Sequence, residues 1–215
     1  MKTIKHHLTD DLLIAYAAGN MPEAFSLIVA THISMCDTCR AALAAHESVG
    51  GALIEDTRPA AVTDDLLART LASIERPVPA PVTLPTRKPG KAPGVLQDYI
   101  GGDLDAIRWK NLGGGVRQSI LKTGNGASAR LLFIPAGKAV PDHGHRGTEL
   151  TLVLQGAFAD SVDRFGPGDI EIATEELDHT PVAEMGEDCI CLAATDAPLR
   201  FNALIPRLLQ PIFRI

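Results

Sequence analysis

The stretch GKAVPDHGHRGTELTLVLQG, residues 137–156, combines metal-binding side chains with the alternation of a β-strand. His143 and His145 lie two residues apart, so on a strand both imidazoles point to the same face. Glu149 opens the next apolar segment, ELTLVLQG, and GPGDIEIATEELDHTP later adds His179. These groups predict a site for a divalent transition metal, without choosing between zinc, iron, manganese and nickel. An open coordination position there would bind a small molecule or activate dioxygen or water.

Further short apolar segments surround this stretch. ARLLFIPAG (129–137), GDIEIA (168–173) and CICLAA (189–194) are separated by turns rich in Gly, Pro and Asp. Strands that recur at about ten residues, with no long helical segment between them, are typical of an all-β barrel or sandwich. Residues 96–215 are therefore predicted to form an all-β domain.

The first 75 residues have the periodicity of helices instead. Thr9 is expected to cap a first helix that ends at Gly19, and Pro22 suits the first turn of a second, EAFSLIVATHIS. A third is expected over 37–52. Thr63 is expected to cap a fourth, DDLLARTLASIE, in which apolar residues recur on one face. Residues 1–75 are thus predicted to form an all-α four-helix bundle.

A proline-rich segment separates the two predicted domains. Residues 76–95, RPVPAPVTLPTRKPGKAPGV, contain six prolines and favour an extended, semi-rigid linker. The linker carries four basic and no acidic residues, whereas residues 1–75 carry 5 Lys/Arg against 10 Asp/Glu and residues 96–215 carry 11 against 16. Two acidic domains disfavour direct nucleic-acid binding and suit a basic protein partner.

Composition also limits the location of the chain. A hydrophobic content of 46% argues against global disorder. No apolar run reaches the ~18 residues of a membrane span, and the N-terminus lacks the continuous apolar core of a secretory signal. We therefore expect a cytoplasmic protein.

The second predicted helix ends in a compact set of metal-binding residues. His32 and Cys36 are four residues apart and share a helix face, and Cys39 follows three residues later. This spacing predicts a structural zinc site, which needs a fourth ligand. His6, His7 and His46 are the candidates in the helical domain, and either His6 or His7 could reach back from ahead of the first helix. Ordinary buried cysteines, or a dithiol redox switch, are the alternatives.

Cys189 and Cys191 form the second cysteine pair. As i and i+2 on a strand they share a face, although such neighbours rarely reach disulfide geometry. They are interpreted as strand core, with oxidation-sensitive thiols near the metal as the alternative.

Residues 137–156 match in full the first signature of the cupin family, and the second signature is kept in part. Gly168, Asp169 and His179 are in place, whereas the usual proline, glycine and asparagine are replaced by Thr174, Glu176 and Ala183. The resemblance implies a cupin barrel whose metal ligands are His143, His145, Glu149 and His179. The metal would be zinc or another divalent transition metal.

The N-terminal domain resembles the zinc-binding anti-sigma domains of bacteria, and the order of the two domains resembles the ChrR family of anti-sigma factors. KHHLTDDLLIAYAAG, residues 5–19, is especially similar to that family, in which the second histidine of the pair binds zinc. The resemblance therefore implies His7 as the fourth ligand beside His32, Cys36 and Cys39. It further implies that the helical domain inhibits an extracytoplasmic-function sigma factor. The cupin would be needed for release upon oxidative stress such as singlet oxygen.

A partner surface is expected among apolar positions that so small a bundle cannot bury completely. The candidates are Leu12, Leu13, Tyr16, Phe25, Leu27 and Ile28, together with Leu67 and Leu71 of the fourth helix. Helix-in-groove recognition is the expected mode. A metal-dependent cupin enzyme of the dioxygenase or isomerase type is the alternative, and a storage or scaffold protein explains less of residues 1–75. We expect a regulator without catalytic residues.

Overall fold

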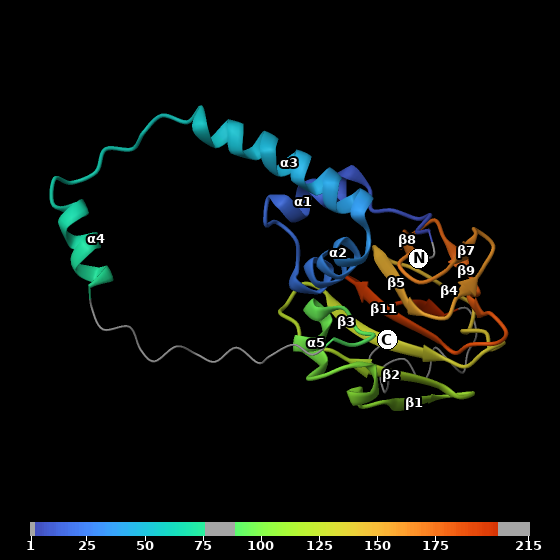
Figure 1. Cartoon of the computed structure of the whole chain (residues 1–215). Helices are drawn as coiled ribbons and strands as arrows, with labels where there is room; N and C mark the ends of the chain where they lie inside the picture. Colours follow the sequence, from blue (N-terminus) through green and yellow to red (C-terminus); the bar gives the residue numbers. More distant parts are fainter. Residues whose placement is uncertain (1–2, 76–88, 202–215) are drawn as a thin grey trace.

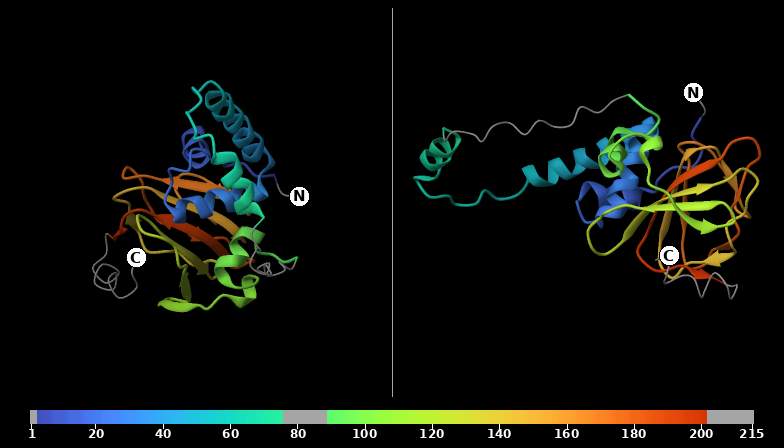
Figure 2. Two further views of the ribbon diagram at one scale, coloured as in Figure 1. Left: turned by 90° about the vertical axis from the view of Figure 1, so that its left-hand side faces the viewer. Right: turned by 90° about the horizontal axis from the view of Figure 1, so that it is seen from below.

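A computed structural model describes residues 3–75 and 89–201 of the chain (Figure 1). Three helices, α1 (Asp10–Ala17), α2 (Glu23–Met35) and α3 (Asp37–Glu55), pack together and lie on a β-domain. A fourth helix, α4 (Leu66–Ile74), lies apart from them in Figures 1 and 2. In the described ranges no helix has both the length and the apolarity needed to cross a membrane.

Local sequence signals explain where the first helices begin and end. The Thr9 hydroxyl accepts a hydrogen bond from the Leu12 N–H at 3.4 Å, so the predicted N-cap is confirmed. Gly19 follows α1 with φ 69°, a left-handed conformation that glycine adopts without strain. Cys36 both ends α2 and caps α3, because its extended backbone breaks the helix while its Sγ accepts from the Cys39 N–H.

The predicted four-helix bundle is not found. The fourth helix begins at Leu66 with Asp65 at the cap position, not at Thr63, and no residue of α4 is buried. The physical reason lies in α2, whose apolar surface is covered by the β-domain. The sheet thus occupies the place where a fourth helix would have closed a bundle.

The β-domain contains one large sheet and two small ones. The large sheet has the order β1-β2-β3-β11-β5-β8 and is antiparallel throughout, and the small sheets have the orders β10-β6-β7 and β12-β4-β9. Their bounds are β1 Lys110–Gly113, β2 Val116–Ile120, β3 Ser128–Ile134, β4 His143–Gly144, β5 Glu149–Gln155, β6 Phe158–Ala159, β7 Arg164–Phe165, β8 Ile170–Ala173, β9 Asp178–His179, β10 Val182–Ala183, β11 Cys189–Thr195 and β12 Arg200–Phe201.

The predicted β-domain is confirmed, but a closed barrel is not. The four apolar segments expected as strands became β3, β5, β8 and β11. Among the described residues the six-stranded ladder ends at β1 on one side and β8 on the other, so it does not close on itself. A short helix, α5 (Gly94–Ile100), and a 3₁₀ turn, η1 (Leu104–Ala106), precede the first strand. Neither was expected, and α5 begins inside the predicted linker, of which residues 76–88 lie outside the described residues.

Strand alternation divides the large sheet into two different faces. On β5, Leu150, Leu152 and Leu154 belong to the core shared with the helices, whereas Val153 belongs to a second core inside the β-domain. Glu149 and Thr151 have the same parity as Val153, so they also face the interior. Both faces are buried, which explains why ELTLVLQ is apolar at even positions and mixed at odd ones.

Helix α2 docks on the outer face of this sheet. It contacts β11, β5 and β3 as well as α1, α3 and α5, and a single hydrophobic core runs from α1 to β11. The Glu23 carboxylate anchors the start of α2, because it accepts hydrogen bonds from the Tyr99 hydroxyl at 2.8 Å and the Gly124 N–H at 2.6 Å. The two predicted domains therefore share one core and are not independent.

Truncation of α2 tests this shared core. Ile28 is completely buried in it, so Ile28→Ala should lower the free energy of unfolding by about 2–5 kcal/mol. Val49→Ala on α3 is the matched control, because Val49 is 62% exposed and its truncation should cost less than about 0.5 kcal/mol.

Urea unfolding supplies the measurement. Trp109, the one tryptophan of the chain, reports on the β-domain, while far-ultraviolet circular dichroism is dominated by the helices. We expect the two signals to give coincident transitions. Two separated transitions would contradict a continuous core.

Candidate metal centres

The four residues of the predicted zinc site come together between the N-terminal segment and the α2–α3 junction. The ligand atoms of His7, His32, Cys36 and Cys39 all lie within 4.8 Å of one another. His7 Nδ1 is 3.3 Å from Cys36 Sγ and 3.6 Å from Cys39 Sγ. His32 Nε2 is 3.3 Å from Cys39 Sγ. We call this set the helical centre.

These distances fit a tetrahedral zinc site. Zinc–sulfur and zinc–nitrogen bonds of about 2.3 and 2.0–2.1 Å place neighbouring ligand atoms roughly 3.3–3.8 Å apart. Burial lowers the pKa of His32 to about 4, so its imidazole is neutral and able to bind metal. Burial also raises the pKa of Cys39 to about 11, because a buried thiolate is unfavourable. A bound zinc ion would offset the negative charge of that thiolate.

The other two candidate histidines have different partners. His6 Nε2 lies 3.0 Å from Asp163 Oδ2, and its ring packs on Phe165 with centroids 4.4 Å apart. His46 Nε2 lies 3.2 Å from Asp10 Oδ1. Of the three candidates left open by spacing, His7 is therefore the one that meets the α2–α3 ligands.

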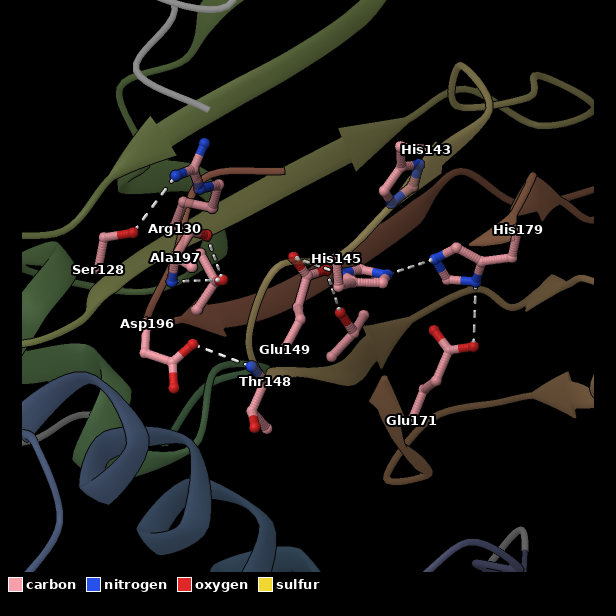
Figure 3. Close-up of polar contacts among 12 residues, drawn as sticks. Ser128, Arg130, His143, His145, Thr148, Glu149, Glu171, His179, Asp196 and Ala197 are labelled. Carbon is pink, nitrogen blue, oxygen red and sulfur yellow. Dashed lines mark hydrogen bonds and ion pairs between the residues drawn. The ribbon is translucent and has the colours of Figure 1, made fainter. Parts of the chain in front are cut away.

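The second predicted site forms inside the β-domain, from β4, β9 and the residue after β4. His143, His145 and His179 are buried, and their ligand atoms lie within 4.8 Å of one another. His145 Nε2 is 3.3 Å from His179 Nε2, as expected for two nitrogens bound to one metal ion (Figure 3). Burial lowers the pKa values of His143 and His145 to about 4, so both rings are neutral. We call this set the cupin centre.

Glu149, the fourth predicted ligand, lies at the edge of this cluster. Its Oε2 is 3.9 Å from His145 Nδ1 (Figure 3). Its Oε1 accepts a hydrogen bond from the Thr151 hydroxyl at 3.1 Å. Burial raises the pKa of Glu149, although the neighbouring Arg130 acts in the opposite direction. The structure thus brings three of the four predicted ligands together and holds the carboxylate next to them.

Two acidic residues beside His179 were missed by sequence reasoning. His179 Nδ1 lies 2.7 Å from Asp160 Oδ2 and 3.3 Å from Glu171 Oε1. Burial opposes a charge on His179, but these carboxylates outweigh it and raise its pKa to about 9. A metal-binding histidine commonly donates its second N–H to a carboxylate, so the pair would orient Nε2 toward a metal ion, which on binding would displace the Nε2 proton. One sequence feature could have predicted such a partner for His179: Glu171 is an acidic residue at an interior-facing position of an otherwise apolar strand.

The second cysteine pair lies in the interior core of the β-domain. Cys189 and Cys191 are both buried, and their Sγ atoms are 3.5 Å apart. The hydrogen bond between the two thiols raises the pKa of Cys191, and burial adds to that effect. Both residues pack with Ile134, Val153 and Phe158.

The residues predicted to bind a partner separate into three groups. Leu13, Phe25, Leu27 and Ile28 are buried in the shared core, and Leu12 and Tyr16 are partly buried against it. Leu67 and Leu71 of α4 are 70% and 51% exposed. The expectation of an exposed surface therefore holds for α4 and not for the inner face of α2.

Substitution of a cysteine tests the helical centre. Cys39→Ser should remove zinc from it and unfold α1–α3, because a structural zinc ion supplies about 10–16 kcal/mol of apparent binding free energy. The zinc content of the purified protein and its helical circular dichroism measure the effect. Cys189→Ser, which changes a buried cysteine away from this centre, should retain the helical zinc. Unchanged zinc content in Cys39→Ser would refute the assignment.

Substitution of a histidine tests the cupin centre. A metal at a hundredfold excess over its dissociation constant stabilises a native protein by about 2.7 kcal/mol. Wild-type protein should gain stability of this order when zinc, iron(II), manganese(II) or nickel(II) is added. His145→Ala should gain none from the cupin centre, whereas His46→Ala, on α3, should respond as the wild type does. Equal stabilisation of His145→Ala and wild type would argue against the site.

Fold and geometry together define a protein with two clusters of candidate metal ligands, in which a helical unit carrying a His₂Cys₂ cluster is docked on a cupin-like β-domain. The ChrR cupin-like domain family matches residues 97–198. The Anti-sigma-E factor ChrR of Cereibacter sphaeroides is 62% identical over 213 residues, which cover 99% of this chain and 100% of the relative. The chain therefore belongs to the ChrR family.

A solved structure supports the same relationship. In the crystal structure of Rhodobacter sphaeroides SigE in complex with the anti-sigma ChrR, one chain is 60% identical to this one. The match has a TM-score of 0.78 and covers 90% of this chain and 100% of that chain.

Proposed function

We propose that this chain is an anti-sigma factor that binds and inhibits an extracytoplasmic-function sigma factor through its helical domain. The observation that carries the proposal is the 62% identity, over nearly the whole chain, to a protein named as an anti-sigma factor. The relative solved in complex with SigE supports a sigma factor as the partner. Both relationships favour a regulator in the cytoplasm over an enzyme, and the acidic charge of both domains favours a protein partner over nucleic acid.

Exposed apolar residues on α4 and on the second half of α3 are the proposed sigma-binding surface. Leu67, Leu71 and Ile74 recur at helical spacing on one face of α4, and Ile74 is 69% exposed. On α3, burial stops at Leu43, and the helix then extends from the body of the molecule (Figure 1). Val49, Leu53 and Ile54 in this part of α3 are exposed. Apolar faces without a partner in their own chain are typical of helix-in-groove recognition.

The buried members of the predicted surface have a second role in this proposal. Leu13, Phe25, Leu27 and Ile28 would reach a sigma factor only if the helical unit left the sheet. Leu12 and Tyr16, which are partly buried, could contribute at the edge. The initial contact is therefore assigned to Leu67 and Leu71.

In this proposal the helical centre has a structural role and the cupin centre a sensory one. Zinc at His7, His32, Cys36 and Cys39 would join the N-terminal segment to α2 and α3 and so hold the helical domain in its binding conformation. A divalent metal at His143, His145 and His179, with Glu149 beside them, would make the cupin domain responsive to oxidants such as singlet oxygen. That response would release the sigma factor.

Charge substitutions on α4 test the proposal. Leu67→Asp/Leu71→Asp should weaken binding of the sigma factor by at least a hundredfold, about 2.7 kcal/mol, because two apolar contacts would be replaced by desolvated carboxylates. The measurement is calorimetric titration of the full-length variant with the SigE-like sigma factor of the same organism. In-vitro transcription with core polymerase reports inhibition.

The control places a charge on an exposed apolar residue far from α4. Met185 is 85% exposed on the β-domain, and Met185→Asp should bind with wild-type affinity. Cys36→Ser should also lose binding, because the helical domain needs its zinc. Wild-type binding by the α4 double variant would exclude this surface, and absence of binding by the wild type would exclude the proposed function.

A further inference from the structure

Residues 160–169, which run from the end of β6 through β7 to the start of β8, contact His179 of the cupin centre and the two residues that precede His7 of the helical centre. We call them the aspartate segment, because Asp160, Asp163 and Asp169 make these contacts. The segment belongs to the β-domain, yet it also lies against residues 4–6 of the N-terminus.

Asp160 connects the segment to the cupin centre. Its Oδ2 lies 2.7 Å from His179 Nδ1, and its side chain is completely buried. Its Oδ1 accepts the backbone N–H of Val162 at 2.8 Å and of Asp163 at 3.3 Å. The carboxylate is therefore fixed by its own loop while it orients the imidazole, and any rotation of His179 would be transmitted to that loop.

Asp169 and Asp163 connect the segment to the helical centre. Asp169 Oδ1 accepts the N–H of Lys5 at 2.6 Å and of His6 at 3.0 Å, while Oδ2 accepts the Gly166 N–H at 2.8 Å. Asp163 Oδ2 lies 3.0 Å from His6 Nε2. These bonds hold the two residues that precede His7.

Close packing reinforces this contact. Gly168 has φ 91°, and a Cβ atom there would lie 2.6 Å from Ile4 Cδ1. The His6 carbonyl also accepts the Ile170 N–H at 3.4 Å. Because His7 reaches the helical centre from outside the α2–α3 junction, its position depends on how residues 4–6 are held.

We infer that the aspartate segment positions one ligand of each metal centre, His179 through Asp160 and His7 through Asp163 and Asp169. Occupancy of the cupin centre is thereby coupled to the stability of the helical centre. The inference rests on the two metals of the proposed function, but it requires no sigma factor. It supplies a physical route, made of direct hydrogen bonds, from the cupin domain to the zinc ligands.

The first test measures metal loss from the helical centre alone. Cobalt bound to cysteine gives a thiolate charge-transfer absorption, which the full-length Cys39→Ser protein should lack. Its decay in excess EDTA is followed in cobalt-loaded wild type and in His145→Ala, whose cupin centre cannot hold metal. We expect faster decay in His145→Ala, within the range of about 5–150-fold that is typical of coupled sites. Equal decay rates would overturn the inference.

The second test removes the contacts between the aspartate segment and residues 5 and 6. In an Asp169→Asn background, the difference between an intact and an emptied cupin centre should disappear. Asp163→Asn, which alters a side chain that is 60% exposed, should reduce that difference even if Asp169→Asn folds poorly. A full difference in both backgrounds would overturn the inference.

Asp103→Asn is the matched control for Asp169→Asn. Asp103 also accepts three backbone N–H bonds, from Lys91 at 2.9 Å, Ala92 at 2.6 Å and Leu104 at 2.8 Å, but none comes from the aspartate segment or residues 4–6. The effect of His145→Ala should persist in this background. Its loss there would mean that general destabilisation, and not the aspartate segment, carries the effect.

Asp160→Asn tests the cupin end of the segment. Loss of a carboxylate that orients a metal-binding histidine typically costs about 10–100-fold in metal affinity, which competition with a chelator measures. The same variant should hasten decay of the helical charge-transfer band, whereas its thermal unfolding without metal should stay close to wild type. An unchanged cupin affinity would overturn the positioning role. None of these experiments contains a sigma factor, so their outcomes are independent of sigma binding.

Discussion

The packing of α2 on the large sheet is the interaction on which the rest of the molecule depends. From Ala24 to His32 this helix is buried at nearly every position, as is typical of a helix surrounded on all sides. Its start is tied to the β-domain through Glu23, and its end supplies Cys36 and leads into α3. One helix therefore sets the position of the helical centre relative to the sheet whose other face carries Glu149, next to the cupin centre.

Strand alternation makes this arrangement possible. A strand buried on both faces can present leucines to α2 at even positions and polar side chains to the interior at odd ones, as Leu150, Thr151 and Leu152 do on β5. The cupin centre is thus separated from the α2 interface by one layer of backbone. Each face is fixed by the same register, so a one-residue slip would disrupt both the interface and the metal site.

The sequence was informative where its signals are local. The Thr9 cap and the spacing of His143 and His145 depend on residues a few positions apart. Docking of α2 depends on segments more than a hundred residues apart, and Asp169 meets Lys5 across 164 positions. No periodicity records such a contact. An amphipathic helix such as α4 has the same apolar periodicity whether its apolar face packs within its own domain or binds another protein.

The division between anchored and exposed parts of the helical unit constrains how a signal can travel. Within residues 3–75 and 89–201, the second half of α3 and all of α4 bury nothing, so the apolar surface proposed for sigma lies away from the β-domain. A change in the cupin domain must then act on α2 or on residues 4–6, where the contacts are. Residues 4–6 are the more economical route, because a shift there displaces His7 without unpacking the core. Loss of that ligand would loosen the α2–α3 junction from which the exposed helix extends.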